Sequence, residues 1–159
     1  MKSFKKINRC RICSYRSLKN VINLKKQYIQ SSFIKKGKQK PYLKKIPLQL
    51  LLCQNCSLVQ LRHTTNKDIL YKNYWYESSI NLTMRQHLKE LAFNGTKILK
   101  KRKKINVLDI GCNDGTLLNF YPKNFEKYGI DPSQIIKKIN KKKIFTIQDY
   151  FPLKKNQKK

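Results

Sequence analysis

The chain has 159 residues, of which 37 are Lys or Arg and 8 are Asp or Glu, and its formal net charge is +29. This length suits one ordinary domain, or a small metal-stapled module followed by part of a larger domain, and the motif spacing favours two modules. So large a positive charge usually indicates nucleic acid or an anionic membrane as the partner. Here 31 of the 37 basic residues are Lys, scattered among abundant Asn, Ile and Tyr, which indicates compositional drift. We expect a solvated, lysine-rich surface, with nucleic-acid binding as the alternative.

The N-terminal segment, residues 1–10, is charged but has no apolar run behind it, unlike a secretory signal. The longest apolar stretch, residues 46–53, is far shorter than the roughly 20 residues that cross a bilayer. We therefore predict a cytoplasmic protein without a membrane span. In a reducing cytosol, the five cysteines are expected to be metal ligands or buried thiols rather than disulfides.

Two CxxC pairs lie in residues 1–65, on either side of a lysine-rich stretch (35–45), in a region without a sustained helical period. We expect this region to be rich in loops and to need a metal for stability. Four thiolates form the closed tetrahedral set of structural zinc and leave no position for a water nucleophile. The predicted zinc ligands are Cys10, Cys13, Cys53 and Cys56.

Two alternatives compete with this zinc site. A redox-active CxxC pair would need to lie at a helix start, whereas here two pairs flank a loop. His63 follows the second pair closely and is an alternative metal ligand.

Residues 66–104 have a helical pattern and are predicted to connect two domains. Asn81 or Thr83 could cap a helix, and Asn94 and Gly95 could kink or end it. Apolar residues recur at spacings of three, four and seven, which places them near one helix face. These residues are Leu82, Leu88, Leu91, Ala92, Ile98 and Leu99.

Residues 105–159 begin with an apolar strand (105–110), a glycine turn (111–115) and a helix that starts at residue 116. A second strand (127–130), a second helix (134–141) and a third strand (143–150) follow, before a polar tail. This order predicts the first half of a doubly wound, Rossmann-like α/β sheet. The expected fold is thus a small zinc-knuckle domain plus an incomplete α/β domain.

The glycine turn has the context of a cofactor site. Glycines allow close backbone approach, and Asp131, at the end of the second strand, could accept hydrogen bonds from both hydroxyls of a ribose. The pyrophosphate-binding fingerprint has glycine where Asn113 stands, and the carboxylates of Asp109 and Asp114 flank the turn. These carboxylates suit the cationic end of S-adenosylmethionine better than the pyrophosphate of NAD. The candidate cofactor-binding residues are Asp109, Gly111, Asn113, Asp114, Gly115, Asp131 and Asp149.

Two of these positions have alternatives. Asp149 could accept a hydrogen bond from the adenine amino group or cap the following turn. Cys112 could face the same pocket, although packing beneath the turn is the favoured interpretation.

Several motifs, in order, resemble the nucleotide-sugar C-methyltransferases of deoxysugar pathways. They are Cys10 to Cys13, Ile46 to Leu48, Cys53 to Leu61, Tyr74 to Ser79, His87, Val107 to Leu118 and Gly129 to Ser133. The resemblance covers nearly the whole chain. It implies an N-terminal zinc-binding domain, a class I S-adenosylmethionine-dependent methyltransferase domain and a C-terminal domain that helps bind the sugar nucleotide.

The implied reaction methylates a nucleotide-linked 4-keto sugar at C3 through an enolate, after a general base removes the C3 proton. In such enzymes the segment containing Tyr74, Tyr76, Ser79 and His87 covers the pocket between the zinc and cofactor domains. Tyr76 and His87 are the tentative catalytic residues, with aromatic packing and a surface position as their respective alternatives.

Family members are more than twice as long as this chain, and the resemblance implies a general-base histidine beyond its last residue. In a doubly wound sheet the fourth strand pairs with the first, so residues 107–110 would have an unpaired apolar edge. We therefore expect a truncated or split gene product, or a second chain that completes the domain, and no methyl-transfer activity from this chain alone. The rival hypotheses are a lysine-rich zinc-ribbon protein that binds nucleic acid and a non-functional remnant.

Overall fold

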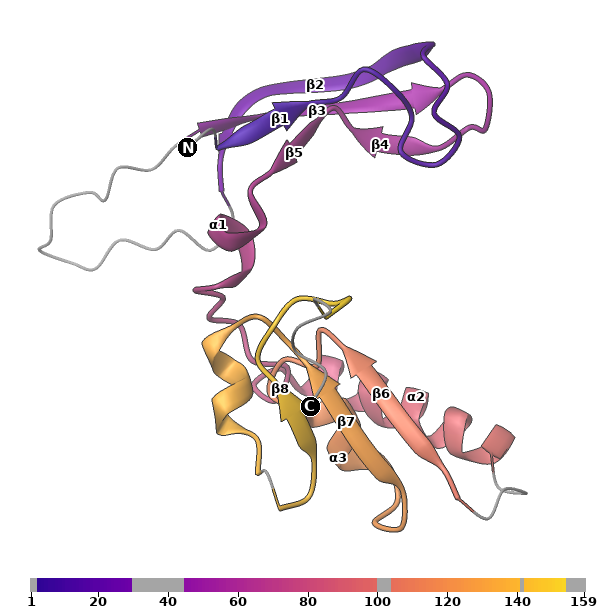
Figure 1. The fold of residues 1–159 in the computed structure, drawn as a ribbon, viewed down its shortest axis with the longest axis vertical. Coiled ribbons are helices and arrows are strands. Elements are labelled where there is room, and N and C mark those ends of the chain that lie inside the picture. The colour runs from indigo at the N-terminus through magenta and orange to yellow at the C-terminus, as the bar shows by residue number, and fades with distance from the viewer. Residues whose placement is uncertain (1–2, 30–44, 100–103, 141, 154–159) are drawn as a thin grey trace, which may run out of the picture. The chain divides into compact units, whose positions relative to one another are not determined.

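The computed structural model describes residues 3–29, 45–99, 104–140 and 142–153 (Figure 1). The chain divides into two compact units, Met1–Leu70 and Tyr71–Lys159. Nearly all of the predicted lysine-rich stretch and polar tail lie outside the described residues.

The first unit is built from five strands and is followed by a short helix. These elements are β1 (Phe4–Lys6), β2 (Leu18–Tyr28), β3 (Lys45–Cys53), β4 (Val59–Leu61), β5 (His63–Thr65) and α1 (Lys67–Tyr71). Strands β2, β3 and β4 form an antiparallel sheet in that order, and β1 pairs with β5.

This region was predicted to be rich in loops, but its described residues include five strands. The apolar stretch 46–53, noted above only for being too short to span a membrane, is β3, and Leu51 and Cys53 on it are fully buried. Its partner β2 has no period-two pattern. The reason is that its pairing register with β3 shifts twice and that Lys25 adopts a positive φ of 57°. Such bulges add a residue to one strand and break the alternation that identifies strands in sequence.

The second unit contains a parallel three-stranded sheet in the order β6, β7, β8. Its elements are α2 (Leu82–Leu99), β6 (Asn106–Ile110), α3 (Thr116–Phe120), β7 (Glu126–Ile130), the 3₁₀ helix η1 (Gln134–Lys138) and β8 (Phe145–Ile147). The predicted alternation of strands and helices is confirmed, although the last helix and strand are shorter than expected. Because the strands are parallel and in register, their carboxyl ends meet at one edge.

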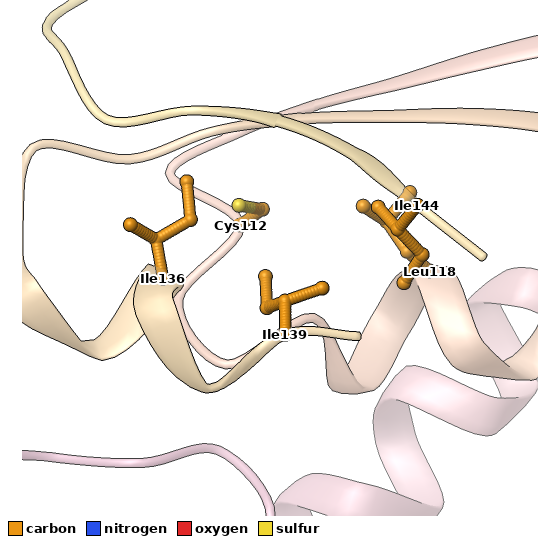
Figure 2. Packing of buried hydrophobic residues seen from close by; sticks show 5 residues of the cluster. All are labelled: Cys112, Leu118, Ile136, Ile139 and Ile144. Atoms are coloured by element: carbon orange, nitrogen blue, oxygen red, sulfur yellow. The ribbon is translucent and has the colours of Figure 1, made fainter. Parts of the chain in front are cut away.

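One face of this sheet is covered by packed side chains. Figure 2 shows the buried cluster, which comprises Cys112, Leu118, Ile136, Ile139 and Ile144. The partly buried Val107 packs against this cluster. The packing interpretation of Cys112 is confirmed, since its side chain is 3% exposed.

The other face carries exposed apolar side chains. Strands β6 to β8 contribute Leu108, Ile110, Tyr128, Phe145 and Ile147, which are 37 to 72% exposed. Parallel sheets normally have both faces covered. The predicted α/β arrangement of parallel strands and helices is confirmed. A doubly wound sheet stays a prediction, because the described residues cover only one face of the sheet.

The helical connector begins at one of its two predicted caps and differs from its prediction further along the helix. Asn81 accepts a hydrogen bond from the Met84 N–H at 3.0 Å and is the cap, whereas Thr83 lies inside α2. The helix continues through Gly95, whose missing Cβ leaves room for the Tyr121 hydroxyl. The predicted apolar face is only partly buried, because Ala92 is 1% exposed but Leu82 and Ile98 are over 80% exposed.

Residues 72–81 form no helix, so the connector is not continuous. None of the helices described is long and apolar enough to cross a membrane.

Candidate metal and cofactor sites

The two CxxC pairs form turns of the same geometry. In the first, the Ser14 N–H donates to the Cys10 carbonyl and the Cys10 N–H donates to the Tyr15 carbonyl. In the second, Ser57 and Leu58 make the same two contacts with Cys53. Ser14 and Ser57 have φ values of 60° and 59°, a left-handed conformation that closes each turn.

These turns bring together four thiols from two pairs that lie 40 or more positions apart in the sequence. All four sulfur atoms lie within 4.8 Å of one another. The Cys10 and Cys56 sulfurs are 3.6 Å apart, and those of Cys13 and Cys53 are 3.5 Å apart. A tetrahedron with metal–sulfur bonds of about 2.3 Å has sulfur–sulfur edges of about 3.8 Å. The predicted ligand set therefore fits a tetrahedral zinc ion.

The electrostatics of this cluster also favour a cation. The backbone N–H of Cys13 is the largest influence that lowers the pKa of Cys10, to about 6. The pKa of Cys56 rises to about 12, because the adjacent thiols and burial outweigh the lowering effect of the Leu58 N–H. Four crowded thiols thus cannot all ionise alone, and a divalent cation would stabilise them as thiolates.

His63 lies outside the four-sulfur cluster. Its ring packs edge-on against Phe4 at 5.2 Å, and burial followed by nearby Arg62 lowers its pKa. His63 is therefore a packing residue of the β1–β5 pair.

The glycine turn joins β6 to α3 and is tied to the end of β7, because the Gly111 and Cys112 N–H groups both donate to the Ile130 carbonyl. The two predicted glycines differ. Both have positive φ, 83° at Gly111 and 76° at Gly115, but a Cβ at Gly115 would lie 3.0 Å from Ile139. A Cβ at Gly111 would meet nothing within 4 Å. Gly115 therefore permits packing, and Gly111 has the open side that a ligand could approach.

Asn113 and Asp131 connect the ends of neighbouring strands. The Asn113 N–H donates to one carboxylate oxygen of Asp131 at 2.9 Å, and the Ser133 N–H donates to the other at 2.8 Å. The Asn113 amide donates to the Tyr76 carbonyl and accepts from the Ser78 N–H. The Asn113 side chain is thus engaged inside the protein, and Asp131, 7% exposed, retains little capacity for a ligand.

Asp114 is also engaged within the chain. One of its oxygens accepts hydrogen bonds from the Thr116 N–H and hydroxyl, and the other accepts from the Ser79 N–H at 2.8 Å. Although burial raises its pKa, the hydrogen bonds from Thr116 and Ser79 bring the pKa of Asp114 below its ordinary value. Asp114 therefore fastens the segment containing Ser79 to the start of α3.

Asp109 differs from both of these carboxylates. Among the described residues, no hydrogen-bond donor or ion-pair partner contacts it. Burial, and then the nearby Asp131, raise the pKa of its carboxyl group above the ordinary value. A half-buried carboxyl with unused acceptor capacity is the feature of this site that most favours a cationic ligand.

The remaining predicted positions are Asp149, Tyr76 and His87. Asp149 lies two residues beyond β8 and accepts a hydrogen bond from the Tyr150 N–H at 2.7 Å. Tyr76 makes edge-on ring contacts with Tyr74 and Trp75. His87 is exposed on α2.

Sequence reasoning missed three residues that shape these sites. Ser78 anchors the segment containing Tyr74 and Tyr76 to Asn113. Gly129 on β7 makes room for Cys112, because a Cβ added at residue 129 would lie 2.7 Å from the Cys112 sulfur. Gln60 is buried beside the metal cluster. All three had a sequence signal, since each lies in a motif that carries the family resemblance.

Comparisons with known proteins support a zinc-binding domain and a resemblance to C-methyltransferases. Residues 10–71 match the family described as "Putative zinc binding domain". Over 129 residues, the chain is 22% identical to the C-methyltransferase NovU of Streptomyces niveus. The matched region covers 80% of this chain and 31% of that protein. The predicted resemblance to C-methyltransferases is confirmed, and residues 10–71 are similar to a zinc-binding domain.

Proposed function

We propose that this chain supplies a structural zinc domain and a methyl-donor site to an S-adenosylmethionine-dependent C-methyltransferase. The observation that carries the proposal is the Asp109 carboxylate, half-buried and without a described partner, two residues before Gly111, where an added Cβ would meet nothing within 4 Å. When bound, S-adenosylmethionine would supply an electrophilic methyl group. Asp109 would face its cationic part.

The same geometry favours this donor over a dinucleotide. A pyrophosphate at this turn would lie near three carboxylates, those of Asp109, Asp114 and Asp131. Repulsion between these negative charges would disfavour its binding. The side chain of Asn113 also occupies the position where the pyrophosphate-binding turn needs glycine.

For the substrate, we propose a nucleotide-linked 4-keto deoxysugar that is methylated at C3. The family resemblance and the C-methyltransferase relative support this assignment. A ketone at C4 acidifies the C3 proton, so a general base forms an enolate that attacks the methyl group. Tyr76 remains the tentative polar contact, because its backbone is fastened to the turn, and the exposed His87 remains a weaker candidate.

We further propose that additional α/β polypeptide covers the exposed face of the sheet, within one chain or as a partner chain. This is supported by the exposed Leu108, Ile110 and Phe145 and by β6, which pairs only with β7 among the described strands. A cytoplasmic location is part of the proposal, since reduced thiols are needed for zinc.

The donor site is tested by calorimetric titration of S-adenosylmethionine into the zinc-loaded chain. Asp109→Asn should weaken binding at least about tenfold, because it removes the charge that faces the sulfonium. Glu126→Gln is the matched control, since Glu126 is an exposed carboxylate at the opposite end of the neighbouring strand. It should leave binding unchanged.

No binding by the wild-type chain, or equal binding by Asp109→Asn, would contradict the donor site. Salt-sensitive binding of DNA or RNA that Asp109→Asn leaves intact would instead support the nucleic-acid alternative.

A further inference from the structure

Gln60 is a buried polar residue on β4, next to the first metal-binding turn. Its side chain is 7% exposed. The carboxamide oxygen accepts two hydrogen bonds from Arg11, one from the backbone N–H and one from Nη1, both at 3.2 Å. Arg11 itself lies between Cys10 and Cys13, so Gln60 joins β4 directly to the turn that presents two ligands.

These contacts determine the orientation of the carboxamide. Both Arg11 groups are donors only, so the Gln60 oxygen must face them and the amide nitrogen must face away. Among the described residues, that nitrogen is buried and meets no hydrogen-bond acceptor of standard geometry. A buried donor without an acceptor is destabilising, so a group that satisfies it is expected.

The nearby group that could satisfy it is the Cys10 sulfur. Arg11 directly follows Cys10, and its backbone N–H donates to the Gln60 oxygen, so the Gln60 carboxamide lies against the turn that carries the Cys10 sulfur. A neutral thiol is a weak acceptor, whereas a thiolate is negatively charged and accepts a charge-assisted bond. The Gln60 nitrogen would thus gain its partner when a metal holds Cys10 as a thiolate.

We propose that Gln60 is a positioning residue of the zinc site, which donates an N–H···S hydrogen bond to the metal-bound Cys10 thiolate while Arg11 fixes its orientation. This rests on the proposed zinc site. Outer hydrogen bonds of this kind withdraw charge from a ligand and orient it toward the metal. Gln60, on β4, would therefore influence the charge and the orientation of the Cys10 thiolate.

The competing explanation is that Gln60 only anchors Arg11. Two variants separate the roles. Gln60→Glu keeps an oxygen acceptor for Arg11 but removes the N–H donor. Gln60→Leu removes both without adding a charge. Gln49→Glu, on the half-buried Gln49 of the adjacent strand, is the matched control for an added carboxylate in the same sheet.

The experiment loads the full chain with Co²⁺ and records the sulfur-to-metal charge-transfer band, then measures Zn²⁺ affinity by chelator competition. Without the N–H donor, the thiolate lone pairs rise in energy. The band should therefore move to lower energy in both Gln60 variants and not in Gln49→Glu. Zn²⁺ affinity should fall about 10- to 100-fold in both.

A spectrum that changes only in Gln60→Leu would show an anchoring role and overturn the proposal, as would unchanged spectra in both variants. If either variant fails to fold, the wild-type chain loaded with ¹¹³Cd tests the same bond. Scalar coupling between the Gln60 amide protons and ¹¹³Cd is expected across the sulfur, and its absence would overturn the proposal.

Failure of the zinc site is distinguishable from failure of this inference. A wild-type chain that gives no four-thiolate Co²⁺ spectrum contradicts the zinc site itself. A normal wild-type spectrum that neither Gln60 variant alters contradicts the role of Gln60 alone.

Discussion

At the residue scale, three carboxylates that look equivalent in sequence have different environments. Asp114 and Asp131 each accept three hydrogen bonds from neighbouring residues, whereas Asp109 has no partner among those described. The first two carboxylates stabilise the turn, and Asp109 has the capacity to accept from a ligand. This difference leads to a specific pH dependence.

S-adenosylmethionine should bind more weakly as the pH falls through the raised pKa of Asp109. The carboxyl group without ligand has a pKa above its ordinary 3.8, because of burial first and Asp131 second. A cationic ligand favours the ionised form, so binding below that pKa must release a proton, and the affinity levels off above it. Calorimetry across pH, in buffers of different ionisation enthalpy, measures this release. Affinity independent of pH in that window, while the chain stays folded, would contradict the assignment, and Asp109→Asn should remove the dependence.

At the element scale, the turn between β6 and α3 depends on a glycine outside it. Gly129 lies on β7, directly opposite Asp109 in the parallel register. The Cys112 sulfur lies where a side chain at residue 129 would project, and Leu118 is 3.2 Å from the same position. The close approach of turn, helix and strand therefore requires that residue 129 has no side chain.

Gly129→Ala should lower the free energy of unfolding by about 1 to 3 kcal/mol, because the added Cβ would lie 2.7 Å from the Cys112 sulfur. Adding Cys112→Ala should restore part of this loss, since contacts at 3.2 Å with the residue 112 Cβ and with Leu118 remain. Denaturant unfolding and a double-mutant cycle measure the coupling. Gly95→Ala is the control: alanine favours the helix, and only the Tyr121 side chain must shift. Equal losses at both glycines would contradict the packing argument.

At the scale of the whole molecule, the two units differ in what stabilises them. Among the described residues of the first unit, the buried apolar side chains are Cys10, Ile46, Leu51 and Cys53. Two of these four are proposed metal ligands, so little apolar core would remain without the ion. The second unit has its own cluster of five buried side chains on one face of the sheet.

Removal of zinc by a chelator should therefore unfold the first unit and leave the second largely intact. Hydrogen exchange followed by mass spectrometry should show loss of protection in β3 and β4, with little change in β6 and β7. Metal analysis confirms removal, and addition of zinc should restore protection. Protection of β3 that persists in the metal-free chain would show that the metal is not needed for this fold.

The sequence by itself determined the four clustered cysteines, the parallel strands and the position of the glycine turn, because close spacing and short apolar runs report local geometry. It did not reveal the β2–β3 hairpin, because bulges in β2 break the alternation of its side chains. Nor could it distinguish Asp109 from Asp114, or show that Gln60 is buried beside Cys10. Those distinctions depend on hydrogen bonds between residues 35 or more positions apart, which form only when the chain is folded. Spacing thus identifies which residues could act, and the tertiary contacts decide which of them keep an atom free to do so.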